Sequence, residues 1–242
     1  MFSTGSTAVE GSPDIVAFVA DDKRHRFLSL VYLHLTGATL GTILLVGLLL
    51  RIGSSNAVQY RLIRFEHAVL AGCILTTLAV AVALRLWAVR SQSLSLIRQY
   101  VLLSAAVAVI SASIWPALQL AQLHQANLPR NLAVMSGVVV GGLALSHWFA
   151  SCGSTWYVRY AVTLILTAVA MLFVLTIFGR TLTPQLWLPA AMIAAAATAI
   201  QYEITDVMHA CRTDEYVLAA TVLCGFGTLL AVLTLPWMLA VI

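Results

Sequence analysis

The chain has 242 residues, of which 61% are hydrophobic and only 9% charged, and its mean hydropathy is +0.97. A soluble domain carries roughly 25% charged residues, so this sequence has too few charges for a water-facing surface, and we expect most of its surface to face lipid. The net charge of +4 comes from basic residues at the ends of apolar runs. No basic face with interleaved aromatic residues is present, which argues against nucleic-acid binding.

The N-terminal stretch 1–26 is polar and contains four acids, Glu10, Asp14, Asp21 and Asp22. It lacks the charged-then-apolar order of a cleavable signal peptide. We therefore predict a disordered cytoplasmic tail over residues 1–26, followed by a single transmembrane domain over residues 27–242.

Long apolar runs follow the tail, each near the 20 residues that a helix needs to cross the hydrocarbon layer. Lipid offers the backbone no hydrogen bonds, so such runs are expected to be helical. The sequence thus predicts an all-α bundle of about seven transmembrane helices. The fifth and sixth runs are joined so closely that a hairpin is an alternative, and the last run could enter the membrane without crossing it. The predicted spans are Phe27–Leu50, Ala68–Val89, Gln99–Leu123, Asn131–Ala150, Tyr157–Gly179, Leu182–Tyr202 and Tyr216–Ile242.

Basic residues predict the orientation of these spans. A cytoplasmic N-terminus places eight lysines and arginines on the cytoplasmic side and five on the other side, so the positive-inside rule favours that orientation. Arg85 lies near the far end of the second run, where we expect its side chain to snorkel to the interface. The eight residues are Lys23, Arg24, Arg26, Arg85, Arg90, Arg98, Arg159 and Arg212, and the five are Arg51, Arg61, Arg64, Arg130 and Arg180.

Small residues and cysteines suggest packing rather than chemistry. Gly37 and Gly41 form a G-x-x-x-G pattern in the first span, which is typical of closely packed helices. No cysteine spacing fits zinc, and no protease, hydrolase or P-loop motif occurs, so we expect neither a metal or other cofactor nor an enzyme. Cys73 and Cys224 are interpreted as buried thiols. A Cys152–Cys211 disulfide requires both loops to share an oxidising compartment.

The acids cluster in one stretch near the C-terminus. Glu203 and Asp206 are three residues apart, and a helix would place them on one face. Carboxylates at a membrane boundary suggest function by default. Two interpretations remain open: a proton-sensitive latch, because two close carboxylates do not both ionise easily, or two solvated groups at a helix end. The spacing alone favours the second. Supporting polar residues nearby are Tyr202, Asp214 and Glu215.

Glu66 and His67 lie at the mouth of the second span, near Arg61 and Arg64. They could pair with Glu203 and Asp206 across the bundle, or they could simply be the solvated start of a helix. The second interpretation is the better supported, because a charged residue at the start of a span has water within reach.

The stretch Gln201-Tyr202-Glu203-Ile204-Thr205, followed by Asp214-Glu215-Tyr216-Val217-Leu218-Ala219-Ala220, resembles the C-terminal signature of the transmembrane Bax inhibitor motif family. There a Tyr-Asp-Thr closes the sixth helix and an acidic-Tyr-Ile-x-Ala-Ala opens the seventh. The entry to the first span is also similar, with Arg26-Phe27-Leu28, Val31-Tyr32 and Leu35. The resemblance covers the seven-span layout of nearly the whole chain through local, degenerate motifs.

The resemblance implies a Bax-inhibitor-like bundle that leaks calcium from internal stores and restrains cell death. The family senses pH with two aspartates, one at the end of the sixth helix and one in the seventh. Glu203 falls on the first position, but the second falls near Phe226, where no acid exists. Asp206 could substitute for it. Twelve arginines against one lysine also resemble the seven-span members carried by cytomegaloviruses.

These observations give two hypotheses of different classes. The first is a protein of the endoplasmic reticulum, Golgi or another intracellular membrane, of the host if the protein is viral. It would modulate calcium leak and survival signalling through Glu203 and Asp206, with calcium as the permeant ion. The second is a non-conducting adaptor or immunomodulator that binds host membrane proteins through its spans.

Overall fold

The computed structural model describes residues 15–53, 55–90, 95–124 and 199–241, together with positions 133, 134, 136, 137, 139–141 and 143. Throughout these residues the regular structure is helical, apart from an isolated bridge between Ile15 and Arg212. Residues 199–210 are also helical. The named elements are the 3-10 helix η1 (Val16–Phe18) and the α-helices α1 (Asp21–Ile52), α2 (Asn56–Arg64), α3 (Glu66–Arg90), α4 (Leu96–His124) and α8 (Tyr216–Val241).

Helices α1, α3 and α4 are each long and apolar enough to cross a membrane. They contain the first three predicted spans and extend each of them by one to six residues at each end. The seventh predicted span coincides with the helix α8, whose stretch Tyr216–Leu230 is an apolar helix. The prediction of an all-α chain is therefore confirmed over the described residues, with three helices that are compatible with a membrane protein.

The remaining predicted spans fall mostly outside the described residues. The fifth span, 157–179, lies wholly outside, as does the sixth apart from residues 199–202. The described positions of the fourth span, between 133 and 143, are helical. That the chain crosses the membrane seven times stays a prediction.

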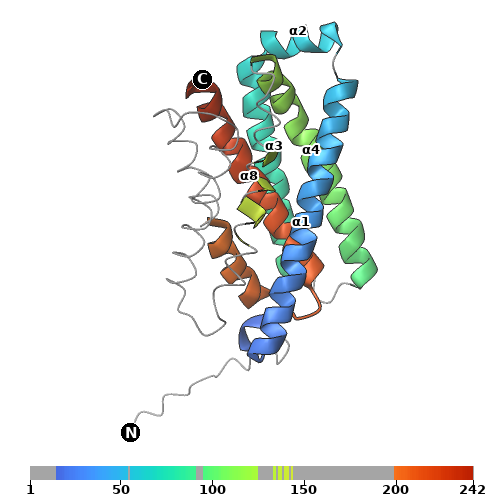
Figure 1. The fold of residues 1–242 in the computed structure, drawn as a ribbon, viewed down its shortest axis with the longest axis vertical. Coiled ribbons are helices and arrows are strands. Elements are labelled where there is room, and N and C mark those ends of the chain that lie inside the picture. The colour runs from blue at the N-terminus through green and yellow to red at the C-terminus, as the bar shows by residue number, and fades with distance from the viewer. Residues whose placement is uncertain are drawn as a thin grey trace.

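Four helices, α1, α3, α4 and α8, run side by side, and α2 lies across one end of them (Figure 1). Helix α8 packs against each of the other three. The end of α3 and the starts of α4 and α8 meet at the opposite end of the bundle, which we call the Arg85 end. The end that carries α2 is called the α2 end. Basic residues that were predicted for opposite sides of the membrane lie at opposite ends of the bundle. Lys23, Arg85, Arg98 and Arg212 are at the Arg85 end, and Arg51, Arg61 and Arg64 are at the α2 end.

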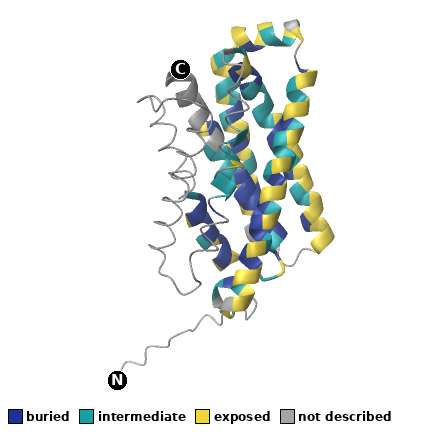
Figure 2. Ribbon diagram, viewed as in Figure 1, coloured by how far each residue is buried: buried dark blue, intermediate teal, exposed yellow. Residues whose placement is uncertain are grey.

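Burial follows the lipid-facing pattern expected from composition (Figure 2). The first half of α8 is almost entirely buried, from Val217 to Cys224, because helices surround it. The outer face of α1 instead exposes large leucines, including Leu33, Leu40 and Leu44. Exposed leucine side chains are more stable in contact with lipid chains than with water, so this face is suited to lipid contact.

The N-terminal region differs from the predicted tail. Helix α1 begins at Asp21, so the basic residues before the first apolar run are helical. Ile15 bridges to Arg212, and Val16 donates its backbone N–H to the carbonyl of Cys211 at 3.2 Å. The Arg24 guanidinium donates to the carbonyls of residues 17 and 19. Residues 15–26 are therefore anchored to the Arg85 end rather than disordered, while residues 1–14 lie outside the described residues.

The two glycines of the G-x-x-x-G pattern have different surroundings. A methyl group at Gly41 would lie 3.6 Å from Val107 Cγ1, so this glycine faces α4. A methyl group at Gly37 would meet no atom of the described residues within 4 Å. Within the described part of the bundle, Gly41 therefore packs against a neighbouring helix and Gly37 does not.

Candidate functional site

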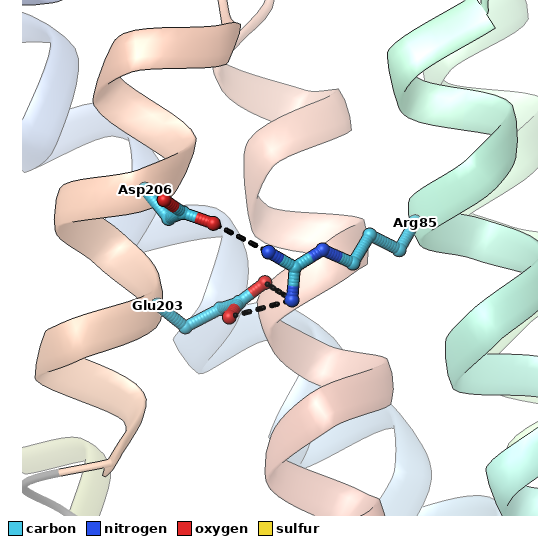
Figure 3. Close-up of polar contacts among 3 residues, drawn as sticks. All are labelled: Arg85, Glu203 and Asp206. Atoms are coloured by element: carbon cyan, nitrogen blue, oxygen red, sulfur yellow. Dashed lines mark hydrogen bonds and ion pairs between the residues drawn. The ribbon is translucent and has the colours of Figure 1, made fainter.

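Arg85 joins the two predicted carboxylates at one end of the bundle (Figure 3). Its Nη1 lies 3.1 Å from both carboxylate oxygens of Glu203, and its Nη2 donates to Asp206 Oδ2. Arg85 is on α3, whereas both acids are on the helical segment 199–210. The guanidinium presents its donors as a rigid fork, which suits two acceptors that are one helical turn apart.

The three side chains differ in burial. Glu203 is only 4% exposed, whereas the side chains of Arg85 and Asp206 are about half exposed, at 50% and 51%. A buried carboxylate is costly unless a charge and hydrogen bonds compensate it. Arg85 supplies both to Glu203, while Asp206 is a partly solvated second partner. The cluster carries one net negative charge when both acids are ionised.

This geometry corrects the solvated interpretation of the two acids. That interpretation is wrong for Glu203, which is buried and ion-paired, and it holds in part for Asp206. The face shared by the two residues is as predicted. Arg85 does not simply snorkel, because its guanidinium is engaged by two carboxylates.

The position of Arg85 in the sequence was the one indication that it could belong to the site. It is the one charged residue well inside the second apolar run, and the antiparallel order of the helices brings the end of that run to the level of the acids. Close packing between α3 and α8 holds the end of α3 that carries Arg85 at this level. A methyl group at Gly225 of α8 would come within 3.0 Å of Leu84 Cδ1, the neighbour of Arg85 in the chain.

Glu215 and Asp214 have structural roles in the turn before α8. The Glu215 carboxylate accepts the backbone N–H of Arg212 at 3.0 Å, and the Glu215 N–H donates to the Arg212 carbonyl at the same distance. Glu215 is buried, and its carboxylate closes the turn that starts α8. The Asp214 side chain is exposed. Neither residue is shown in contact with Arg85.

Gln99 of α4 was not singled out from the sequence, yet it ties α4 to the start of α8. It is 1% exposed. Its Oε1 accepts the backbone N–H of Leu218 at 3.3 Å, and its Nε2 lies 3.4 Å from the carbonyl of Asp214. The first N–H groups of a helix have no partner within the helix, so this amide satisfies one of them.

Tyr202, Glu66 and His67 are not part of the cluster. Tyr202 is exposed on segment 199–210. Glu66 and His67 begin α3 at the α2 end, and the separation of 19 positions between Glu66 and Arg85 corresponds to about 28 Å of helix. The proposed pairing of Glu66 and His67 with Glu203 and Asp206 is therefore wrong, and the helix-start interpretation agrees with the structure.

Three ring side chains, those of His34, Tyr100 and Tyr216, lie close together toward the Arg85 end of the bundle. His34 of α1 is hydrogen-bonded through Nδ1 to the carbonyl of Leu30 at 2.7 Å and through Nε2 to the hydroxyl of Tyr100 at 2.8 Å. A carbonyl only accepts, so Nδ1 carries a hydrogen, and in the neutral ring Nε2 accepts from Tyr100. The Tyr216 ring packs 5.2 Å from the His34 ring. The group joins α1, α4 and α8.

Cys73, Cys211 and Cys224 are free and buried, whereas Cys152 lies outside the described residues. This confirms the interpretation of Cys73 and Cys224, and it shows that the conditional bridge to Cys211 is not formed. Burial, followed by the nearby Glu215 carboxylate, raises the pKa of the Cys211 thiol from 9.0 to about 12. The thiol is therefore protonated and unreactive at neutral pH.

Among the described residues no group of three or more His, Cys, Asp or Glu side chains is arranged to hold a metal ion. Phe226, near which the resemblance places the family's second aspartate, is half-buried and packs against the core. No family model, curated protein or solved structure matches this chain.

Proposed function

We propose that this protein modulates calcium leak across an intracellular membrane, and thereby survival signalling, through the Arg85–Glu203–Asp206 cluster. The observation that carries the proposal is a buried carboxylate, Glu203, whose charge partner comes from a neighbouring helix at the end of an apolar bundle. Ionisable groups in such positions are costly and are kept mainly at ion pathways and switches. The resemblance to the Bax inhibitor motif family, including its viral seven-span members, supports the same class of function.

Arg85 already provides the positive charge that the two acids attract. A passing cation therefore competes with the guanidinium for Glu203 and Asp206. Two carboxylates offer at most four oxygens, whereas calcium prefers six to eight. The cluster is suited to brief contact during passage rather than to storage.

Liposomes containing the purified protein and a calcium dye test this proposal. We expect Glu203→Gln to lower calcium flux, because the buried negative charge is lost. We expect Arg85→Gln to raise it, because the competing cation is removed. Asp22→Asn, an exposed acid near the same end of the bundle, is the matched control. Wild-type flux equal to that of empty liposomes contradicts conduction, and unchanged flux in both variants removes the cluster from the mechanism.

A second candidate is a non-conducting adaptor that binds membrane proteins of the host. The outward-facing Gly37, flanked by the exposed Leu33 and Leu40 on α1, favours it, because a small residue on a lipid-facing surface lets another helix approach closely. The loss of the seventh-helix acid at Phe226 points the same way. Co-purification of a membrane partner that Gly37→Leu abolishes, together with absent calcium flux, would decide for this function.

A further inference from the structure

Helix α2 connects two helices that are fit to span the membrane. Helix α1 ends at Ile52 and α3 begins at Glu66, and α2 lies across the bundle between these points (Figure 1). A segment that links two spans on the same side must emerge where hydrocarbon gives way to headgroups. Helix α2 therefore lies at this boundary, at the end opposite to Arg85.

The two faces of α2 differ in a way that suits such a boundary. The inner face packs through the buried Leu62 and the half-buried Val58. The outer face exposes Tyr60 at 66% and Ile63 at 55%. Exposing such large apolar side chains to water is unfavourable, whereas a helix at the membrane interface inserts them between lipids.

Arginines lie among these apolar side chains. Arg61 and Arg64 are both exposed and occupy the last turn of α2, three residues apart, and Arg51 is exposed at the end of α1. The Arg64 guanidinium also lies 5.6 Å from the centre of the exposed Phe65 ring. Between positions 51 and 67 the sequence has three arginines against one acid, Glu66. The exposed surface is therefore cationic and apolar at once.

We infer that α2 is a phospholipid-binding helix, in which Arg61 and Arg64 bind lipid phosphates while Tyr60 and Ile63 insert beside the acyl chains. Guanidinium groups match phosphate oxygens in charge and in fork geometry. A favourable interaction with the helix dipole would account for arginines in the last turn, but not for the apolar side chains exposed between them. The site lies about the length of α3 away from the Arg85 cluster and does not depend on the proposed function.

Native mass spectrometry of the detergent-purified protein tests this inference with phosphatidate and with diacylglycerol of the same acyl chains. The wild type is expected to retain phosphatidate but not diacylglycerol. The double variant R61Q/R64Q is expected to lose roughly 25-fold in phosphatidate affinity, because each arginine near an anionic surface contributes about a factor of five. Arg98→Gln, an exposed arginine at the other end of the bundle, should leave retention unchanged.

Equal retention of phosphatidate by R61Q/R64Q and the wild type would overturn the inference. Equal affinity for glycerol 3-phosphate and phosphatidate would also overturn it, because the site would then bind a soluble phosphate rather than a lipid. A spin label at Ile63→Cys gives an independent check in nanodiscs. The label should be more accessible to oxygen than to a water-soluble nickel complex, and the reverse order would place α2 in water.

Discussion

Glu203 and Arg85 are separated by 118 positions in the chain, yet Arg85 Nη1 lies 3.1 Å from the Glu203 carboxylate. The pair links α3 to segment 199–210, and Asp206 adds a second, more exposed acceptor. Because Glu203 is buried and Asp206 is not, the two acids are not equivalent. The pair should therefore be more important for stability than the Arg85–Asp206 contact.

We expect Arg85→Gln to lower the free energy of unfolding by about 1–2 kcal/mol, since it leaves the Glu203 carboxylate without its charge partner. The half-exposed position of Arg85 keeps the loss below that of a fully buried pair. Asp206→Asn should cost less than about 0.5 kcal/mol. Denaturant unfolding in detergent micelles measures both values. Adding Glu203→Gln to Arg85→Gln should recover part of the loss, and strict additivity of the two substitutions would show that the residues are not coupled.

The second prediction concerns Gln99. Its buried amide accepts the Leu218 N–H and donates to the Asp214 carbonyl, both at the start of α8. Gln99→Leu preserves most of the volume but leaves the Leu218 N–H and the Asp214 carbonyl without this partner. We expect a loss of about 1–3 kcal/mol in the free energy of unfolding. Hydrogen exchange should rise at the Leu218 amide in particular. Ile97→Ala, at a highly exposed position in the same turn of α4, is the control, and an equal effect from both substitutions would contradict the role given to Gln99.

Alanine substitutions at Gly37, within α1, and at Gly53, directly after α1, should change the free energy of unfolding in opposite directions. A methyl group at Gly53, which follows the helix, would lie 2.3 Å from Trp115 Cζ2, so Gly53→Ala has to displace the ring and should destabilise the protein by about 1–3 kcal/mol. Gly37→Ala meets no atom of the described residues within 4 Å and should stabilise the helix by about 0.5–1 kcal/mol. Thermal unfolding of both variants in one detergent gives the comparison. Destabilisation by Gly37→Ala would show that this position is packed against another segment or another molecule.

The sequence was sufficient to predict α1, α3 and α4 to within a few residues at most ends, because the thickness of hydrocarbon and the need to satisfy the backbone fix both the length and the type of such elements. It did not predict α2, whose nine residues bury only one large side chain, Leu62, and so give no long apolar run. The partner of Glu203 was also missed. Hydropathy gives the order of the spans along the chain, whereas the Arg85 contact depends on which helices are neighbours, and that is decided by local fit such as Gly225 against Leu84.

Cys211 provides a prediction that depends on pH. Its pKa is raised to about 12, first by burial and then by the Glu215 carboxylate, so only about one thiol in ten thousand is ionised at pH 8. In a variant that retains Cys211 as its only cysteine, a soluble maleimide should react very slowly with the folded protein, and the rate should rise about tenfold per pH unit from 7 to 10 without a plateau. Lys23→Cys in a background without native cysteines supplies an exposed thiol outside the first predicted span, whose rate should level off near pH 9. Labelling of Cys211 at the rate of this control at pH 7.5 would mean that the contact between the N-terminal residues 15 and 16 and the turn before α8 does not cover the thiol in solution.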